Sequence, residues 1–177
     1  MSKKQNSVFL IGPMGAGKTS IGRQLAKDLG MDFYDSDEVI EQRTGADIPW
    51  IFDIEGEEGF RKREQKVLEE LTQLAGIVLS TGGGTVGLAE NRALLAANGV
   101  VVYLRTTLKD QMERTSRSKK RPLSREEKKR RELLSKFQVQ HGHLYEDLAD
   151  LVYDTDKCSV RHVAREIVNK LLEEEYI

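Results

Sequence analysis

The feature that most constrains the fold is the alternation of short, mostly apolar runs with longer helical patterns along the chain. Five of these runs predict strands, at residues 7–11, 32–35, 76–80, 101–104 and 150–154. Apolar residues at helical spacing predict a helix that begins at Lys18, one over about 57–75, and one from about 159 to 172. Short strands that alternate with helices imply right-handed βαβ units. We therefore expect an α/β fold with a five-stranded parallel sheet and helices on both faces.

Length and composition favour one soluble α/β domain over residues 1–177. The formal net charge of −1 argues against a general nucleic-acid-binding protein, because such proteins usually carry a clear basic excess. The N-terminal segment has no apolar region long enough for a signal peptide or a membrane span, so no membrane partner is expected. Cys158 is the one cysteine, which excludes an internal disulfide, and we expect a cytoplasmic protein.

The segment GPMGAGKT, residues 12–19, matches the pattern G-x-x-x-x-G-K-[ST]. An apolar strand precedes it and an amphipathic helix follows, which is the context that a phosphate-binding loop requires. Glycines let backbone N–H groups curl around a phosphate, and the helix N-terminus adds the positive end of its dipole. Lys18 is expected to reach the β- and γ-phosphates, and the Thr19 hydroxyl to bind Mg²⁺. The motif predicts binding of ATP or GTP.

Two carboxylates follow the second predicted strand, in the sequence YDSDEV. One of Asp35 and Asp37 would hold Mg²⁺ through water, and the other could face an acceptor hydroxyl. The alternative is that Ser36 or Asp37 simply caps the following helix. The guanine-reading element N-K-x-D of GTPases is missing, because the Asn169–Lys170 pair is followed by two leucines.

Charged residues in two further segments are candidates for binding anions. Arg61 and Glu64 are three residues apart and share one face of a helix, so Arg61 could bind a carboxylate, although a solvated charge run is the alternative. The basic segment at 114–131 is interrupted by one proline. Phosphoryl transfer needs cations around the γ-phosphate and little water, so we expect a mobile lid at about 114–128.

A second glycine-rich segment, STGGGTVG, follows the third predicted strand. Gly82, Gly84 and Gly87 fit the dinucleotide pattern G-x-G-x-x-G. That pattern wants an acidic residue near the end of the next strand, where Arg105 stands, and an arginine would suit only NADP. The match to the dinucleotide pattern is therefore interpreted as a coincidence.

Together these segments resemble the shikimate kinase family. The resemblance covers nearly the whole chain and rests on GPMGAGKT, FYDSD, EGEEGFRKRE, STGGGTV, VVYL, KKRPL and LYEDLAD, in the order and spacing of the family. It implies the fold of the nucleoside monophosphate kinases and transfer of the γ-phosphoryl group of ATP to the 3-hydroxyl of shikimate, on the route to chorismate. The implied partners are ATP, Mg²⁺ and shikimate, and a monomer is expected.

The resemblance also implies roles for residues around ATP. The phosphates would be held by Met14, Gly15, Ala16, Gly17, Lys18 and Thr19. Thr19 would bind Mg²⁺, with Asp35 assisting through water. Arg121 would close with the lid onto the transferring phosphate. Arg114 would lie against the adenine, opposite residues 155–159.

On the acceptor side, the resemblance implies that Asp37 contacts the 3-hydroxyl as a base or orienting group. Arg61 would bind the shikimate carboxylate, and Glu64 would support the site. Apolar walls would come from Ile48, Phe52, Phe60 and Leu123. Gly82, Gly83 and Gly84 would bring a backbone N–H close to the shikimate ring, because they carry no side chains.

One position departs from the family pattern. The family usually carries a second substrate arginine four residues before the tyrosine of its PLY segment, and here that position is His141. A guanidinium binds a carboxylate with two hydrogen bonds, whereas an imidazole offers one and is mostly neutral at pH 7. Four alternatives stay open. Either His141 binds the carboxylate weakly, or a nearby Arg or Lys takes its place, or the acceptor is a different molecule, or His141 is only a surface residue. A kinase for another small hydroxylated acid and a non-catalytic nucleotide-binding regulatory module therefore stay open as alternatives.

Overall fold

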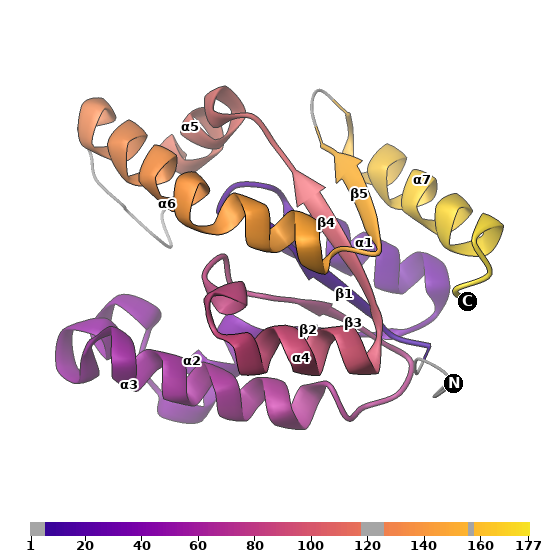
Figure 1. Ribbon diagram of the computed structural model, residues 1–177, viewed down its shortest axis with the longest axis horizontal. Coiled ribbons are helices and arrows are strands. Elements are labelled where there is room, and N and C mark those ends of the chain that lie inside the picture. The colour runs from indigo at the N-terminus through magenta and orange to yellow at the C-terminus, as the bar shows by residue number, and fades with distance from the viewer. Residues whose placement is uncertain (1–5, 118–125, 156–157) are drawn as a thin grey trace.

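The computed structural model describes residues 6–117, 126–155 and 158–177, which form an α/β fold with helices on both sides of one sheet (Figure 1). Five parallel strands pair in the order β2-β3-β1-β4-β5. They are β1 (Val8–Ile11), β2 (Asp32–Asp35), β3 (Ile77–Ser80), β4 (Val100–Arg105) and β5 (Leu151–Asp154). The predicted five-stranded parallel sheet is confirmed, and each strand ends within one residue of its predicted bounds.

The order of the strands places the loop after β1 where ligands bind in this kind of sheet. From β1 the chain moves outward to β2 on one side, and after β3 it continues with β4 on the other side of β1. Such a reversal opens a crevice beyond the carboxyl ends of the central strands. The glycine-rich segments after β1 and β3 both begin at this edge of the sheet.

The helices that cover the sheet are α1 (Lys18–Leu29), α2 (Ser36–Thr44), α3 (Ile48–Leu71), α4 (Ala89–Asn98), α5 (Leu108–Ser116), α6 (Glu127–Leu148) and α7 (Val160–Glu173), with a short 3₁₀ helix, η1 (Thr85–Gly87). Helix α1 begins at Lys18 as predicted. Helix α7 begins close to its predicted start, and Ser159 is its N-cap, because the Ser159 hydroxyl accepts a hydrogen bond from the His162 N–H at 3.2 Å.

The helix predicted over 57–75 has different bounds, because α3 begins at Ile48 and ends at Leu71. The missed start has a cap of its own: the Asp47 carboxylate accepts the Trp50 N–H at 2.9 Å, and a proline occupies the first turn. Gly56 breaks the helix internally with φ 71° and ψ −179°, a conformation that favours glycine. The segment 48–55 before this break and the segment after it both reach the functional site described below.

Alternation along β1 divides the core into two layers. Phe9 and Ile11 pack with buried residues of α3, α4 and α6, while Val8 and Leu10 pack with buried residues of α1 and α7. Residues on a strand point to opposite faces in turn, so a strand buried on both faces must be apolar throughout. In the part of the chain that the structure describes, no helix is long and apolar enough to cross a membrane.

Candidate active site

The loop between β1 and α1 wraps around the side chain of its own lysine. Gly12, Gly15 and Gly17 have positive φ angles of 147°, 80° and 89°. At Gly12 an added Cβ would also lie 2.5 Å from the Leu104 carbonyl oxygen, so a side chain there would be excluded. Lys18 Nζ donates to the carbonyl oxygens of Gly12 at 2.6 Å and of the next residue at 2.9 Å. The ammonium group is thus held over the loop, where an anion would lie.

A hydroxyl and a carboxylate meet beside this loop. Thr19 Oγ1 donates to Asp35 Oδ2 at 2.7 Å. The other oxygen, Asp35 Oδ1, accepts the N–H groups of Asp37 at 3.0 Å and Glu38 at 3.2 Å, so Asp35 is the N-cap of α2. The alternative that Ser36 or Asp37 caps this helix is therefore wrong. The Asp37 carboxylate does not cap the helix and lines the two cavities described next.

A cavity of about 410 Å³, here called the loop cavity, extends along this edge of the sheet. Its walls come from the glycine loop, the start of α2 and the end of β3, and include Met14, Gly15, Gly17, Lys18, Thr19, Asp35, Asp37, Thr81, Gly82, Gly83 and Arg114. Arg114 Nη1 donates to the Gly15 carbonyl oxygen at 2.8 Å, and Nη2 donates to that of Thr155 at 3.3 Å. Arg114 therefore ties the loop to the segment that follows β5.

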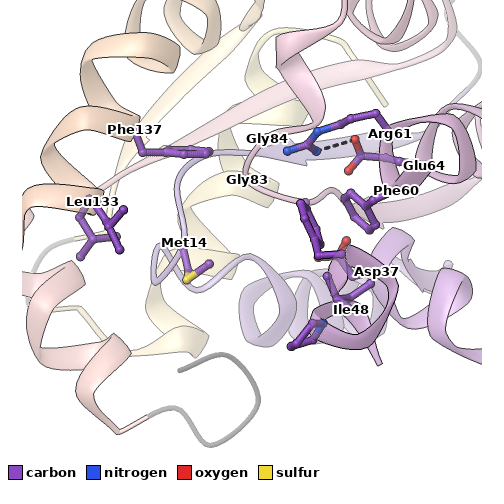
Figure 2. A pocket seen from close by; sticks show the side chains of 14 residues that line it. Met14, Asp37, Ile48, Phe60, Arg61, Glu64, Gly83, Gly84, Leu133 and Phe137 are labelled. Carbon is purple, nitrogen blue, oxygen red and sulfur yellow. Dashed lines mark hydrogen bonds and ion pairs between the residues drawn. The ribbon is translucent and has the colours of Figure 1, made fainter. Parts of the chain in front are cut away.

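A second cavity, of about 330 Å³, lies next to the first and is mostly apolar (Figure 2). It is lined by Met14, Asp37, Ile48, Pro49, Phe52, Phe60, Arg61, Glu64, Gly82, Gly83, Gly84, Leu133, Leu134 and Phe137. Of the expected apolar wall, Ile48, Phe52 and Phe60 lie here. The contribution of α6, through Leu133, Leu134 and Phe137, was not predicted. The apolar cavity and the loop cavity share Met14, Asp37, Gly82 and Gly83, so the two are contiguous.

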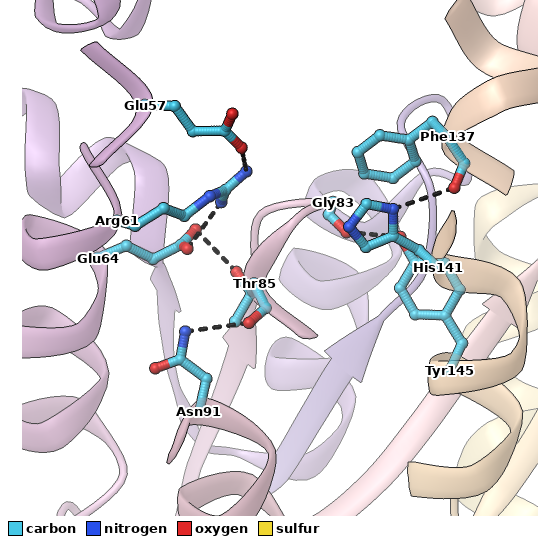
Figure 3. A network of polar contacts seen from close by, with 9 residues as sticks. All are labelled: Glu57, Arg61, Glu64, Gly83, Thr85, Asn91, Phe137, His141 and Tyr145. Carbon is cyan, nitrogen blue, oxygen red and sulfur yellow. Dashed lines mark hydrogen bonds and ion pairs between the residues drawn. The ribbon is translucent and has the colours of Figure 1, made fainter. Parts of the chain in front are cut away.

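Arg61 belongs to a buried polar network at the edge of the apolar cavity (Figure 3). Its Nη1 donates to Glu64 Oε1 at 2.8 Å, and Glu64 Oε2 accepts the Thr85 hydroxyl at 2.9 Å. The Thr85 carbonyl in turn accepts Asn91 Nδ2 at 3.0 Å. Glu64 is fully buried, and this burial raises the pKa of its carboxyl, while Arg61 and Thr85 act in the opposite direction. The network fixes Arg61 while leaving its side chain 20% exposed toward the cavity.

The three consecutive glycines make room for charged side chains of the protein itself. A Cβ added at Gly82 would lie 3.0 Å from Asp37 Oδ1 and 3.1 Å from Glu64 Oε2. At Gly84 it would lie 2.2 Å from Arg61 Nη2, whereas at Gly83 the nearest atoms are 3.5 Å away. The expectation that these glycines let a ligand approach the backbone closely stays a prediction. The structure adds a separate reason for glycine at two of the positions: the carboxylates of Asp37 and Glu64 pack against Gly82, and the guanidinium of Arg61 packs against Gly84.

His141 lies one helical turn beyond the wall of the apolar cavity. Its Nδ1 is 3.0 Å from the Phe137 carbonyl oxygen, and its ring stacks on that of Phe137 with centroids 4.0 Å apart. His141 is not among the lining residues of the cavity. Arg121 and Leu123 lie outside the residues that the structure describes, as does most of the predicted lid at 114–128.

Several residues of the site escaped sequence reasoning. Thr85 directly follows the glycine triplet, so its place next to Glu64 was open to prediction, but Asn91 carried no signal. Tyr145 lies in the segment LYEDLAD, and its hydroxyl donates to the Gly83 carbonyl oxygen. Within the described ranges no group of three or more potential metal-binding His, Cys, Asp or Glu side chains occurs.

Comparisons with known proteins identify the family of this chain. The family model "Shikimate kinase" matches residues 14–172. "Shikimate kinase 1" of Pectobacterium atrosepticum is 56% identical over 171 residues, covering 97% of this chain and 98% of the relative. The protein of that name in Yersinia pestis is 55% identical over 171 residues, with the same coverage of 97% and 98%.

Solved structures show the same likeness. Shikimate kinase from Acinetobacter baumannii in complex with shikimate has a TM-score of 0.92 at 43% identity, covering 99% of this chain and 97% of that chain. Shikimate kinase from Bacteroides thetaiotaomicron has a TM-score of 0.87 at 28% identity, covering 97% and 98%. By sequence and by structure, this chain belongs to the shikimate kinase family.

Proposed function

We propose that this protein transfers the γ-phosphoryl group of ATP to the 3-hydroxyl of shikimate, giving shikimate 3-phosphate and ADP. The observation that carries the proposal is the contact between the two cavities at Asp37 and the glycine pair 82–83. A molecule in the apolar cavity would therefore lie next to phosphates in the loop cavity. The neighbour from Acinetobacter baumannii, 43% identical, contains shikimate.

Asp37 is proposed to act on the acceptor hydroxyl. It lines both cavities, and Asp35 takes over the capping that would otherwise occupy it. A carboxylate at this junction accepts a hydrogen bond from the hydroxyl, aims its oxygen at the γ-phosphorus, and can take the proton as the bond to phosphorus forms.

Arg61 is proposed to bind the shikimate carboxylate. Its Nη1 is held by the buried Glu64, whereas its Nη2 lies 3.6 Å from Oε1 of the exposed Glu57, a longer ion pair that a substrate carboxylate would replace by a charge-assisted contact. The apolar walls exclude water from the ring of the substrate, and the N–H groups of Gly83 and Gly84 are proposed donors to its hydroxyls. His141 is proposed as the second, weaker contact to the carboxylate, although its ring lies behind Phe137.

The phosphates of ATP are proposed to lie over residues 14–19, with Lys18 neutralising the charge that develops during transfer. Arg114, which already binds the loop and the segment after β5, is proposed to pack against adenine. Arg121 is proposed to close onto the transferring phosphate as part of a lid over 114–128.

Thr19 and Asp35 are proposed to hold Mg²⁺. Their oxygens lie 2.7 Å apart and line the loop cavity, and a hydroxyl with a carboxylate is the hard-oxygen donor set that Mg²⁺ prefers. One or two protein oxygens are enough for this ion, because it keeps waters and phosphate oxygens as its other ligands. When bound, it would neutralise phosphate charge and orient the γ-phosphoryl group.

We also propose that the protein acts in the cytoplasm as a monomer, without nucleic-acid or membrane partners. The near-neutral net charge supports small-molecule substrates. The exposed free Cys158 supports a reducing compartment.

The decisive experiment measures ADP release from Mg-ATP by the purified protein with and without shikimate, followed by mass analysis of the product. Strong dependence on shikimate and a monophosphorylated product are expected. If saturating shikimate gives no stimulation while ATP still binds, the assignment fails. The departure at His141 would then favour a kinase for another hydroxylated acid, or a regulatory module if no acid stimulates ADP release.

A further inference from the structure

One face of α6 brings aromatic rings toward the glycine triplet. Phe137, His141 and Tyr145 follow one another at intervals of four residues, and the first of them lines the apolar cavity. Tyr145 is fully buried, and its hydroxyl donates to the Gly83 carbonyl oxygen (Figure 3). The bond joins two segments 62 residues apart in the chain.

The ring of Tyr145 is held against the central sheet. It stacks on Tyr103 of β4, with centroids 5.1 Å apart and an interplanar angle of 28°. Tyr103 is itself 1% exposed and is paired in register with Ile11 of β1, directly before the phosphate-binding loop. Burial also raises the pKa of Tyr145, so its hydroxyl keeps the proton that it donates. The donor therefore sits on a rigid support.

This hydrogen bond fixes the orientation of the peptide group between Gly83 and Gly84. A peptide group is planar and trans, so its carbonyl and its N–H point in opposite directions. The Gly83 carbonyl points toward Tyr145, which does not line the apolar cavity, whereas Gly84 does line it. The Gly84 N–H is thereby directed to the cavity side, and no described residue accepts a hydrogen bond from it.

The peptide group between Gly83 and Gly84 is the central one of a turn that the Thr85 N–H closes onto the Gly82 carbonyl oxygen at 3.2 Å, and such a peptide can rotate while the turn stays closed. Gly83 and Gly84 carry no Cβ, so their backbone has access to more conformations than that of other residues. The neighbouring Gly82 is held separately, because its N–H donates to Ser36 Oγ at 3.2 Å. Loss of the Tyr145 hydroxyl is thus expected to act on the Gly83–Gly84 peptide and to leave the phosphate-binding loop in place.

We propose that Tyr145 is a positioning residue for the acceptor: its hydroxyl holds the Gly83 carbonyl so that the Gly84 N–H is presented to a hydroxyl of the bound substrate. The proposal deepens the proposed function and rests on it. Tyr145 contacts no reacting atom and acts only through the peptide group that it orients.

The test compares Tyr145→Phe with Tyr103→Phe by steady-state kinetics. The second variant is a matched control, because it removes a buried hydroxyl from the same ring pair, but one that bonds to Gln138 and not to the glycine triplet. For Tyr145→Phe the KM for shikimate should rise about fivefold to tenfold, the effect of one neutral hydrogen bond. Its kcat and its KM for ATP should stay within about twofold. Tyr103→Phe should change none of the three by more than about twofold.

A purely structural role would give another pattern. Tyr145→Phe would then lower the melting temperature and the active fraction, with an unchanged KM for shikimate, and the proposal would be overturned. Amide hydrogen exchange of the parent protein supplies a measurement that needs no variant. Shikimate without ATP should slow exchange of the Gly84 amide, and an amide that stays unprotected at saturation would also overturn the proposal.

The outcome separates this proposal from the function on which it rests. Shikimate-dependent turnover by the parent protein together with an unchanged KM in Tyr145→Phe refutes only the positioning role. A parent protein that never phosphorylates shikimate refutes the proposed function, and the role of Tyr145 with it.

Discussion

Replacing Gly84 by alanine tests whether Arg61 can keep its position only if residue 84 has no side chain. The added Cβ would lie 2.2 Å from Arg61 Nη2, 2.8 Å from Cζ and 2.9 Å from Nη1. Three contacts this short with one guanidinium leave it no room, so the group must leave its position. Gly84 has φ −90° and ψ 2°, so the backbone itself accepts alanine without strain.

The size of the effect follows from the displacement. Ordinary van der Waals contact begins at 3.4 Å, so the guanidinium must move by about 1.2 Å. Arg61 would lose its alignment with Glu64, now at 2.8 Å, and with a carboxylate in the apolar cavity. A misplacement of about 1 Å can lower a rate about 100-fold, and one hydrogen bond to a charged group contributes about 1.5–3 kcal/mol. We expect kcat/KM for shikimate to fall by about 10-fold to 100-fold.

The assay is coupled ADP release at saturating ATP over a range of shikimate concentrations, with the KM for ATP measured separately. Gly83→Ala is the matched comparison, because it adds the same methyl group one residue earlier, where the nearest atoms are 3.5 Å away. Its loss should be several-fold smaller. If Gly84→Ala keeps the parent kcat/KM for shikimate, Arg61 does not need the position seen here. The account of the triplet would then be refuted.

Three further predictions concern single side chains of the site. His141→Arg should lower the KM for shikimate with little change in kcat, because an arginine adds binding in both ground and transition states; an unchanged KM in steady-state kinetics would show that another residue holds the carboxylate. Asp37→Asn should lower kcat by about 100-fold or more while calorimetric ATP binding persists, and a kcat within tenfold of the parent would exclude Asp37 as base or orienting group. Burial raises the pKa of Glu64 above its ordinary 4.5, so the folded protein holds this proton more tightly than the unfolded chain, and the contribution of Glu64 to the free energy of unfolding declines as pH rises. We therefore expect the free energy of unfolding of Glu64→Gln minus that of the parent, both measured with urea, to increase from pH 4 to pH 7. A difference that stays constant would contradict the raised pKa.

The sequence predicted those parts of the site whose residues lie close together along the chain. The phosphate-binding loop is one contiguous motif between a strand and a helix. The Arg61–Glu64 pair depends only on helical spacing, and its two residues meet at 2.8 Å. For the same reason the parallel sheet followed from the alternation of strands with helices.

The parts that it missed depend on contacts between distant segments. The α6 side of the apolar cavity and the bond from Tyr145 to Gly83 form only when the sheet has brought α6 over the triplet. The sequence offers Ser36 or Asp37 as the N-cap of α2 only as an alternative and does not single out Asp35, because all three residue types are good caps and only the backbone decides among them. Nothing local reveals that Gly84 lies under a guanidinium from another helix.

The shared wall of the two cavities has a consequence for inhibitor design. Because Met14, Asp37, Gly82 and Gly83 belong to both, a compound that joins an acidic ring to a phosphate mimic needs almost no spacer. A short, stiff connection gives the second half a high effective concentration once the first has bound, so two weak fragments can combine into a tight one. The apolar cavity would contribute selectivity to such a compound, since its walls come from α3 and α6 and not from the nucleotide-binding loop alone.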